Sequence, residues 1–216
     1  MGIDFLYRVL FIIAAYLFGS FPTAYVVYKI RKGDDIRKYG SGNAGGTNVT
    51  RTLGVSYGII TIITDIIKGF IPILVLYFIY PEDIPENMIL LALVSVAVIL
   101  GHVFPVYIKF RGGKGIAVSF GVIIAVSCLP FIDNPVWMEI LPIFIILGIW
   151  AIIFSIFRIV SLASLCAAFV NPFAFYFTGY GWVIVIAAFL WSVLMFITHR
   201  ENIKRLIKKE EKKLKR

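Results

Sequence analysis

The chain has 216 residues, of which 60% are hydrophobic, and its mean hydropathy is +0.93. A soluble domain of this size is usually closer to half apolar, so the composition excludes an ordinary soluble enzyme and indicates a single membrane domain. The net charge is +9, but nothing beyond a basic tail favours a nucleic-acid partner, and we expect none.

Apolar runs of about 20 residues recur along the chain, and each can cross a hydrocarbon core roughly 30 Å thick. The first run lacks a small-residue cleavage site, which favours a permanent span over a signal peptide. Pro172 predicts a kink in the sixth span. The predicted fold is an all-α membrane protein with seven transmembrane helices, at Leu6–Ile30, Gly58–Tyr80, Met88–Ile108, Ile116–Ile132, Ile140–Phe157, Leu162–Phe177 and Trp182–Thr198.

The charges predict how this bundle is oriented. Of the 21 lysines and arginines, 19 fall in the loops on one side and in the tail, and lysine-rich and arginine-rich loops are typical of the cytoplasmic side. We therefore expect a cytoplasmic C-terminus and an outside N-terminus, with a membrane domain over 1–200 and a basic, helical tail over 201–216. The opposite loops carry no lysine or arginine and hold only acidic charges, at Glu82, Asp83, Glu86, Asp133 and Glu139.

The first polar cluster on the basic side is the run GSGNAGGTN at positions 40–48, followed by Arg51. Glycines allow backbone N–H groups to turn toward one point and form an anion-binding concavity. A flexible connector is the alternative, but a connector does not need this composition. The candidate phosphate-binding residues here are Ser41, Gly42, Asn43, Thr47 and Asn48.

The second cluster is GGKG at positions 112–115, directly before a predicted helix. Such a turn presents free N–H donors and the positive end of the helix dipole to an anion, and Lys114 adds a full charge. It is not a Walker loop, because Gly115 follows the lysine and Ile108 stands where the first glycine should be. Gly113 joins the candidates, and His102, one or two turns into the membrane, is either a supporting or a packing residue.

Two further clusters and one charged pair complete the polar inventory. Ser161 precedes the sixth span as a cap or a packing residue, and His199 and Asn202 share a helix face at the end of the seventh. Asp65 and Lys68 lie within the second span, where charges are costly and usually face protein or water. They are either a structural ion pair or a support for the polar clusters. All the clusters lie on one side, so we predict a site for two phosphate-bearing substrates, at least one of which carries an acyl chain.

The combined motifs resemble the acyl-phosphate-dependent glycerol-3-phosphate acyltransferases, the bacterial PlsY family. The resemblance rests on GSGNAGGTN with Arg51, on GHVFPVYIKFRGGKG, on SLAS and on HREN, in the family's order. It implies a seven-helix enzyme of the bacterial cytoplasmic membrane whose active site faces the cytoplasm. It also implies acyl transfer from acyl phosphate to the 1-hydroxyl of sn-glycerol 3-phosphate, which yields lysophosphatidic acid and phosphate.

Within this hypothesis, Lys114, Arg51, His199 and Asn202 are the catalytic candidates, and Ser161 binds glycerol phosphate beside the last two. We expect no metal and no cofactor, and we expect membrane lipids to surround the protein. The sequence leaves the oligomeric state open, and a monomer is compatible with it. A transporter of an organic phosphate anion is the main alternative, although its site would be expected near the membrane midplane. A phosphatidyl transferase would need clustered aspartates, and a structural scaffold would not explain the glycine loops.

Overall fold

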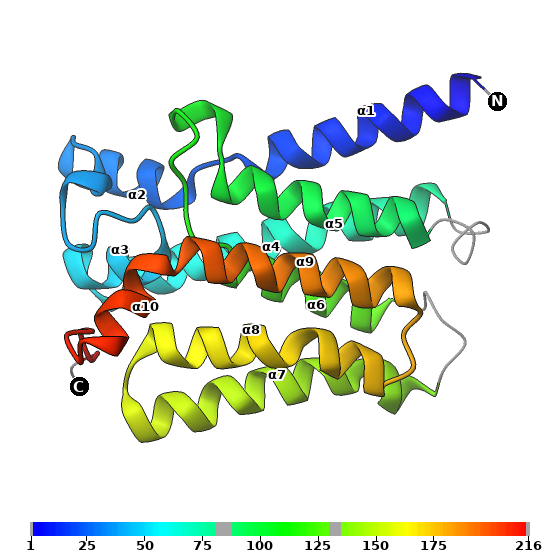
Figure 1. Cartoon of the computed structure of the whole chain (residues 1–216). Coiled ribbons are helices and arrows are strands. Elements are labelled where there is room, and N and C mark those ends of the chain that lie inside the picture. Colours follow the sequence, from blue (N-terminus) through cyan, green and yellow to red (C-terminus); the bar gives the residue numbers. More distant parts are fainter. Residues whose placement is uncertain (1, 81–87, 130–134, 215–216) are drawn as a thin grey trace.

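The computed structural model describes residues 2–80, 88–129 and 135–214, so four of the acidic loop residues above, Glu82, Asp83, Glu86 and Asp133, lie outside it. The described chain is entirely helical (Figure 1). Its α-helices are α1 Gly2–Gly19, α2 Thr23–Lys32, α3 Gly46–Leu53, α4 Val55–Ile79, α5 Met88–Val103, α6 Ile116–Cys128, α7 Val136–Phe157, α8 Val160–Phe177, α9 Trp182–Thr198 and α10 Arg200–Ile207; its 3₁₀ helices are η1 Ile36–Lys38 and η2 Val106–Ile108.

The long helices lie side by side in one bundle, and the short ones gather at one end of it (Figure 1). Helix α1 packs on α5, α4 on α6, and the α7–α8 pair on α9 through α8. The short helices α2, α3 and α10 lie at the end that holds the glycine-rich loops, and the two chain termini lie at opposite ends. This placement brings the polar segments together; which side faces the cytoplasm stays a prediction.

The apolar helices support a membrane protein, but the structure does not establish seven spans. Five described helical segments are long and apolar enough to cross a bilayer, and α9 with α10 adds a sixth if this pair, bent by 62°, counts as one span. Helix α6 has 13 described residues, about 20 Å, which is shorter than a hydrocarbon core. Phe144, Ile152 and Ile156 of α7 are exposed, as expected of a face turned to lipid.

The first expected span, Leu6–Ile30, lies within one apolar segment, Ile3–Lys32, that is long enough to cross a membrane, although the chain turns within it at Ser20–Pro22, between α1 and α2. Proline lacks the N–H that would continue the helix and disfavours helical geometry in the residue before it. The tail was expected to be helical throughout, yet α10 ends at Ile207. Helix α8, by contrast, continues through Pro172 without a break, as expected.

Helices α4 and α6 approach each other so closely that only glycine fits at their contact. A Cβ on Gly121 would lie 1.9 Å from the carbonyl oxygen of Ile66, and a Cβ on Gly69 would lie 2.0 Å from that of Val118. Small residues permit this kind of backbone contact between membrane helices. The contact holds Asp65 of α4 near the loop that leads into α6.

Candidate active site

The glycine loop before α3 is ordered by a single side chain, that of Asn48. Its Oδ1 accepts a hydrogen bond from the backbone N–H of Ser41 at 2.8 Å, and its Nδ2 donates to the carbonyls of Tyr39 and Asn43, each at 3.0 Å. A Cβ on Gly40, whose φ is +63°, would lie 2.1 Å from that Oδ1. The loop therefore wraps around the Asn48 amide, which is 1% exposed. Asn48 was predicted to bind phosphate, but its amide is engaged with the loop's own backbone.

The second glycine loop folds back on the end of α5. The N–H groups of Gly112 and Gly113 donate to the carbonyls of Val103 and His102, both at 3.1 Å. A Cβ on Gly113 would lie 2.1 Å from Nε2 of His102, so any larger residue here would have to displace the buried His102 ring. The backbone then turns at Gly115, with φ +91°, into the first turn of α6. Lys114 is thereby placed at the N-terminal end of α6.

Lys114 links this loop to the end of α9. Its Nζ donates to Oδ1 of Asn202, and its carbonyl accepts from Oγ1 of Thr198 at 3.0 Å. Burial lowers the pKa of Lys114 to about 8, while the negative charge of Glu211 acts in the opposite direction. The lysine is therefore a cation at neutral pH, and it is held where its charge is little screened by water.

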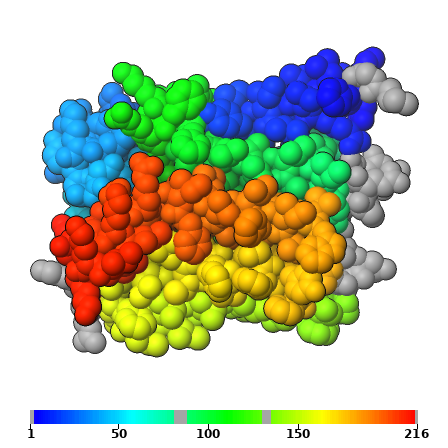
Figure 2. Space-filling view, viewed as in Figure 1, coloured from blue at the N-terminus to red at the C-terminus, as the bar shows by residue number. Residues whose placement is uncertain are grey.

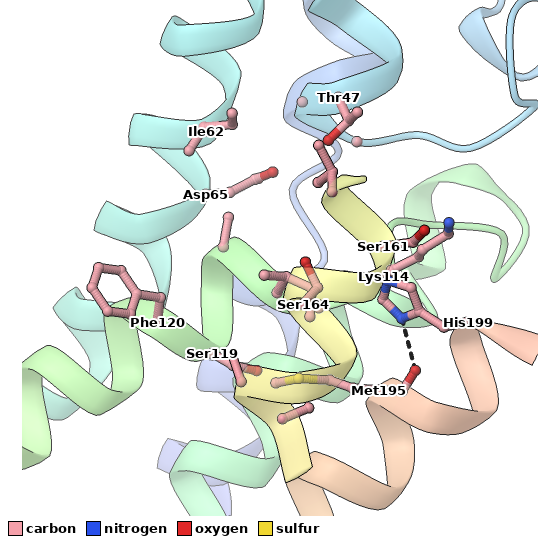
Figure 3. Close-up of a pocket in the computed structure, with 18 of the residues that line it drawn as sticks. Thr47, Ile62, Asp65, Lys114, Ser119, Phe120, Ser161, Ser164, Met195 and His199 are labelled. Carbon is pink, nitrogen blue, oxygen red and sulfur yellow. Dashed lines mark hydrogen bonds between the residues drawn. The ribbon is translucent and has the colours of Figure 1, made fainter. Parts of the chain in front are cut away.

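The chain bends at His199, whose side chain satisfies a carbonyl in the last turn of α9. The carbonyl of Met195 accepts from Nδ1 of His199 at 2.8 Å (Figure 3). A carbonyl oxygen can only accept, so Nδ1 carries the hydrogen and Nε2 keeps its lone pair. His199 thus offers a hydrogen-bond acceptor, and the bend presents Asn202 of α10 to Lys114.

A buried charged group lies behind the polar loops. Nζ of Lys68 is 2.9 Å from Oδ1 of Asp65 and also donates to the carbonyl of Phe21 at 2.8 Å. The hydroxyl of Thr23 donates to the same carboxylate at 3.1 Å, and Nδ1 of His102 is 3.7 Å from it. This group joins α2, α4 and α5, so it supports the arrangement of the loops.

These parts surround one cavity of about 370 Å³. Gly42, Gly113 and Lys68 are the predicted site residues that do not line it. In the view of Figure 3, Lys114, Ser161 and His199 lie on one side of the cavity, and Asp65 lies on the other. The predicted residues that do line it are Ser41, Asn43, Thr47, Asn48, Arg51, Asp65, His102, Lys114, Ser161, His199 and Asn202.

The rest of the cavity wall is largely apolar. Helices α4, α6 and α7 contribute Ile62, Phe120, Ile123 and Leu147, and Trp150 donates from its indole N–H to Ser164 at 3.3 Å. The cavity therefore combines a cationic, donor-rich end with an apolar wall. Such a site suits an amphiphilic ligand with an anionic head and a hydrocarbon chain.

Sequence reasoning missed Glu211, which also lines the cavity. It lies in a run of charges at the end of the chain, where a solvated tail is the usual expectation. Its carboxylate accepts hydrogen bonds from Ser161, Asn202 and Arg205 at 2.9, 2.7 and 2.6 Å. No motif marks this residue, because its partners come from α8 and α10 and meet it only in the folded chain.

The fold and the site define a class: a helical integral membrane protein whose cavity pairs an end lined by Arg51 and Lys114 with an apolar wall. Residues 9–209 match the family model described as glycerol-3-phosphate acyltransferase. A glycerol-3-phosphate acyltransferase of Endomicrobium trichonymphae is 42% identical over 209 residues, which cover 97% of this chain and 96% of that one.

A solved structure of PlsY (YgiH), an integral membrane glycerol 3-phosphate acyltransferase in its glycerol 3-phosphate form, superposes with a TM-score of 0.84. It is 35% identical, and the match covers 96% of both chains. Its lysophosphatidic acid form superposes with a TM-score of 0.80 at 33% identity, over 96% of this chain and 95% of that one. The chain belongs to the PlsY family of glycerol-3-phosphate acyltransferases, and the resemblance seen in its motifs is confirmed.

Proposed function

We propose that this protein transfers a fatty acyl group from acyl phosphate to the 1-hydroxyl of sn-glycerol 3-phosphate, producing lysophosphatidic acid and inorganic phosphate. The observation that carries the proposal is the composition of the cavity lining. It includes the cations Arg51 and Lys114 together with the apolar side chains of Ile62, Phe120 and Leu147. Membership in the family agrees with this activity. The proposed setting is the bacterial cytoplasmic membrane, with the cavity facing the cytoplasm and no metal, cofactor or nucleic acid involved.

We assign the residues by what each can donate. Ser41, Asn43 and Thr47 offer hydroxyl and amide donors around a phosphate, and Arg51 and Lys114 neutralise it. Ser161, His199 and Asn202 hold glycerol 3-phosphate near the reacting hydroxyl, and the apolar wall takes the acyl chain. Asn48 orders the glycine loop before α3. That loop is supported by Gly42, by Gly113 and by the charged pair Asp65–Lys68 with His102.

The reaction needs no covalent enzyme intermediate, because acyl phosphate is an activated mixed anhydride. The hydroxyl oxygen of glycerol 3-phosphate bonds to the carbonyl carbon, the bond from that carbon to the phosphate oxygen breaks, and its electron pair leaves with phosphate. Positioning of two reactants can supply about 7–11 kcal/mol of the acceleration. Lys114 stabilises the negative charge that develops on the carbonyl and phosphate oxygens, whereas the N–H groups of Gly112 and Gly113, predicted to be free for an anion, bond to carbonyls of α5.

His199 is expected to orient the attacking hydroxyl through the lone pair on Nε2. His199→Ala removes this acceptor, and we expect kcat/KM to fall by about 10²-fold. His199→Gln restores an acceptor without a basic nitrogen, and we expect its kcat to stay within about tenfold of the wild-type value, with a substrate phosphate oxygen taking the proton. If kcat of His199→Gln is as low as that of His199→Ala, Nε2 is instead the general base.

The proposal is tested with purified protein, labelled glycerol 3-phosphate, and acyl phosphate, acyl-CoA or acyl-carrier protein as competing donors. We expect labelled lysophosphatidic acid from acyl phosphate, with release of one phosphate per product. Product formed only from a thioester would overturn the donor assignment. Uptake of labelled glycerol 3-phosphate into proteoliposomes without any donor, and no product with one, would favour the transporter alternative.

A further inference from the structure

The segment between α2 and the first glycine loop contacts the loop that leads from α5 to Lys114. Arg37 of η1 donates from Nη1 to the carbonyl of Ile108 at 2.7 Å and, more weakly, to the carbonyl of Arg111 at 3.4 Å. Figure 2 shows the surface of the segment after α2, in blue, beside the green surface of the loop that follows α5. One side chain thus joins two loops whose contacting residues, Arg37 and Ile108, are 71 positions apart in the chain.

The guanidinium of Arg37 is held on its other edge by Asp35. Its Nε donates to both carboxylate oxygens at 3.0 Å and its Nη2 donates to Oδ2 at 2.7 Å, while the backbone N–H of Arg37 donates to Oδ1 at 2.9 Å. These hydrogen bonds keep the pKa of Asp35 below its usual value, so the carboxylate is an anion at neutral pH. The planar guanidinium can make both contacts at once because it carries donors on both edges.

The loop that receives these bonds has a strained backbone. Lys109 and Phe110 both adopt left-handed conformations, each with φ +58°. Residues other than glycine keep such conformations only where the surrounding contacts hold them. Arg37 bonds to the carbonyls directly before and directly after this pair, and Lys114 follows a few residues later. The strained pair is therefore held at both ends by a side chain from another loop.

We infer that Arg37 is a positioning residue for the reaction, whose guanidinium, held by Asp35, fixes the loop over residues 108–113 and thereby the place of Lys114 in the cavity. The inference rests on the proposed function, in which Lys114 stabilises developing negative charge. Arg37 is not among the described residues that line the cavity, so it acts through the loop rather than through a substrate contact. Misplacement of a catalytic group by about 1 Å can lower the rate about 10²-fold.

The kinetic test compares variants of two neighbouring acid–base pairs. We expect Arg37→Ala to lower kcat/KM for acyl transfer by about 10- to 100-fold. Asp35→Asn keeps the size of the side chain but removes the charge that holds the guanidinium, and we expect a loss of about three- to tenfold. Lys38→Ala is the matched control, because exposed Lys38 pairs with Asp34 at 2.6 Å within its own segment, and it should retain wild-type kinetics.

The pH profile separates misplacement of Lys114 from a simple loss of folded protein. Burial is the largest cause of the low pKa of Lys114, about 8, and the charges of Glu211, Arg205 and Arg51 that also act on it stay in place in Arg37→Ala. A shifted loop exposes the lysine to water, which raises its pKa toward the usual value. The decline of kcat/KM that we expect above about pH 8 in wild type should therefore move to higher pH. Loss of folded protein would lower the rate and leave the pH of the decline unchanged.

Hydrogen exchange tests the loop without the reaction. The N–H groups of Gly112 and Gly113, which bond to carbonyls of α5, should exchange faster in Arg37→Ala and at the wild-type rate in Lys38→Ala. Wild-type exchange in Arg37→Ala, or a lowered rate whose decline stays at the wild-type pH, would overturn the inference. Faster exchange in a protein that transfers no acyl group from any donor would reject the proposed function and retain Arg37 as the residue that holds the loop.

Discussion

Lys114→Ala is expected to lower kcat/KM for acyl transfer by about 10²–10³-fold, the effect of removing one donor from a preorganised site that stabilises developing negative charge. Lys114 is the residue that connects the GGKG turn to the bend after α9, through its bond to Asn202. The variant loses both a phosphate cation and this connection. The measurement is steady-state kinetics with each substrate varied in turn.

Arg111→Ala is the matched control, because Arg111 lies on the same loop with an exposed side chain, and we expect it to retain wild-type kinetics.

Lys114→Arg supplies a pH test. The pKa of Lys114 is near 8, so the wild-type lysine is charged below that pH and loses its charge above it. We expect wild-type kcat/KM, which reports the free enzyme, to decline above about pH 8. In Lys114→Arg this decline of kcat/KM should be absent. Full activity of Lys114→Ala would show that Lys114 is not part of the site.

Asn48→Ala is expected to lower kcat/KM by about 10²-fold, although Asn48 is not assigned a substrate contact. Its amide ties Ser41, Tyr39 and Asn43 into one loop, and alanine would leave the N–H of Ser41 and the carbonyl of Asn43 without this partner, whereas the carbonyl of Tyr39 would keep the N–H of Gly42. A buried unpaired polar group costs about 1–3 kcal/mol, so the loop relaxes, and misplacement by about 1 Å is enough for this loss. Kinetics and limited proteolysis within residues 39–45 measure the two effects.

Thr52→Val is the control for this variant. Thr52 lies on the same short helix, and its hydroxyl donates to the carbonyl of Asn48 at 2.8 Å within that helix. We expect near-wild-type kinetics, because a helix carbonyl keeps its backbone partner. If Asn48→Ala were protected from protease and retained its kinetics, the loop would be ordered by its glycines alone.

The membrane helices could be predicted from composition, but their boundaries could be predicted only in part. Hydrophobic runs mark the segment Ile3–Lys32 and the helices α4, α5, α7 and α8 because a bilayer demands long apolar segments with internally satisfied backbones. The first run marked a span, but hydropathy did not mark the turn at Pro22 that separates α1 from α2 within it. Hydropathy indicates whether side chains prefer lipid or water, whereas the position of a turn depends on backbone geometry.

The residues around the cavity were predicted from local motifs that each carry a chemical reason. Glycine turns beside cations indicated Asn43 and Lys114, and the helical spacing of His199 and Asn202 indicated His199, so all three could be chosen from short segments. That the three line a single cavity follows from contacts between distant segments, such as the glycine-dependent packing of α4 on α6.

The sequence by itself determined the class of protein, the family and the side chains available for chemistry, because composition and motif spacing are local properties. Only the tertiary structure decided how those side chains are used. It committed Asn48 to the loop backbone and placed Glu211 among the donors of α8 and α10. Hydrogen bonds are satisfied by whichever groups folding brings within about 3 Å, and no single stretch of chain records that neighbourhood.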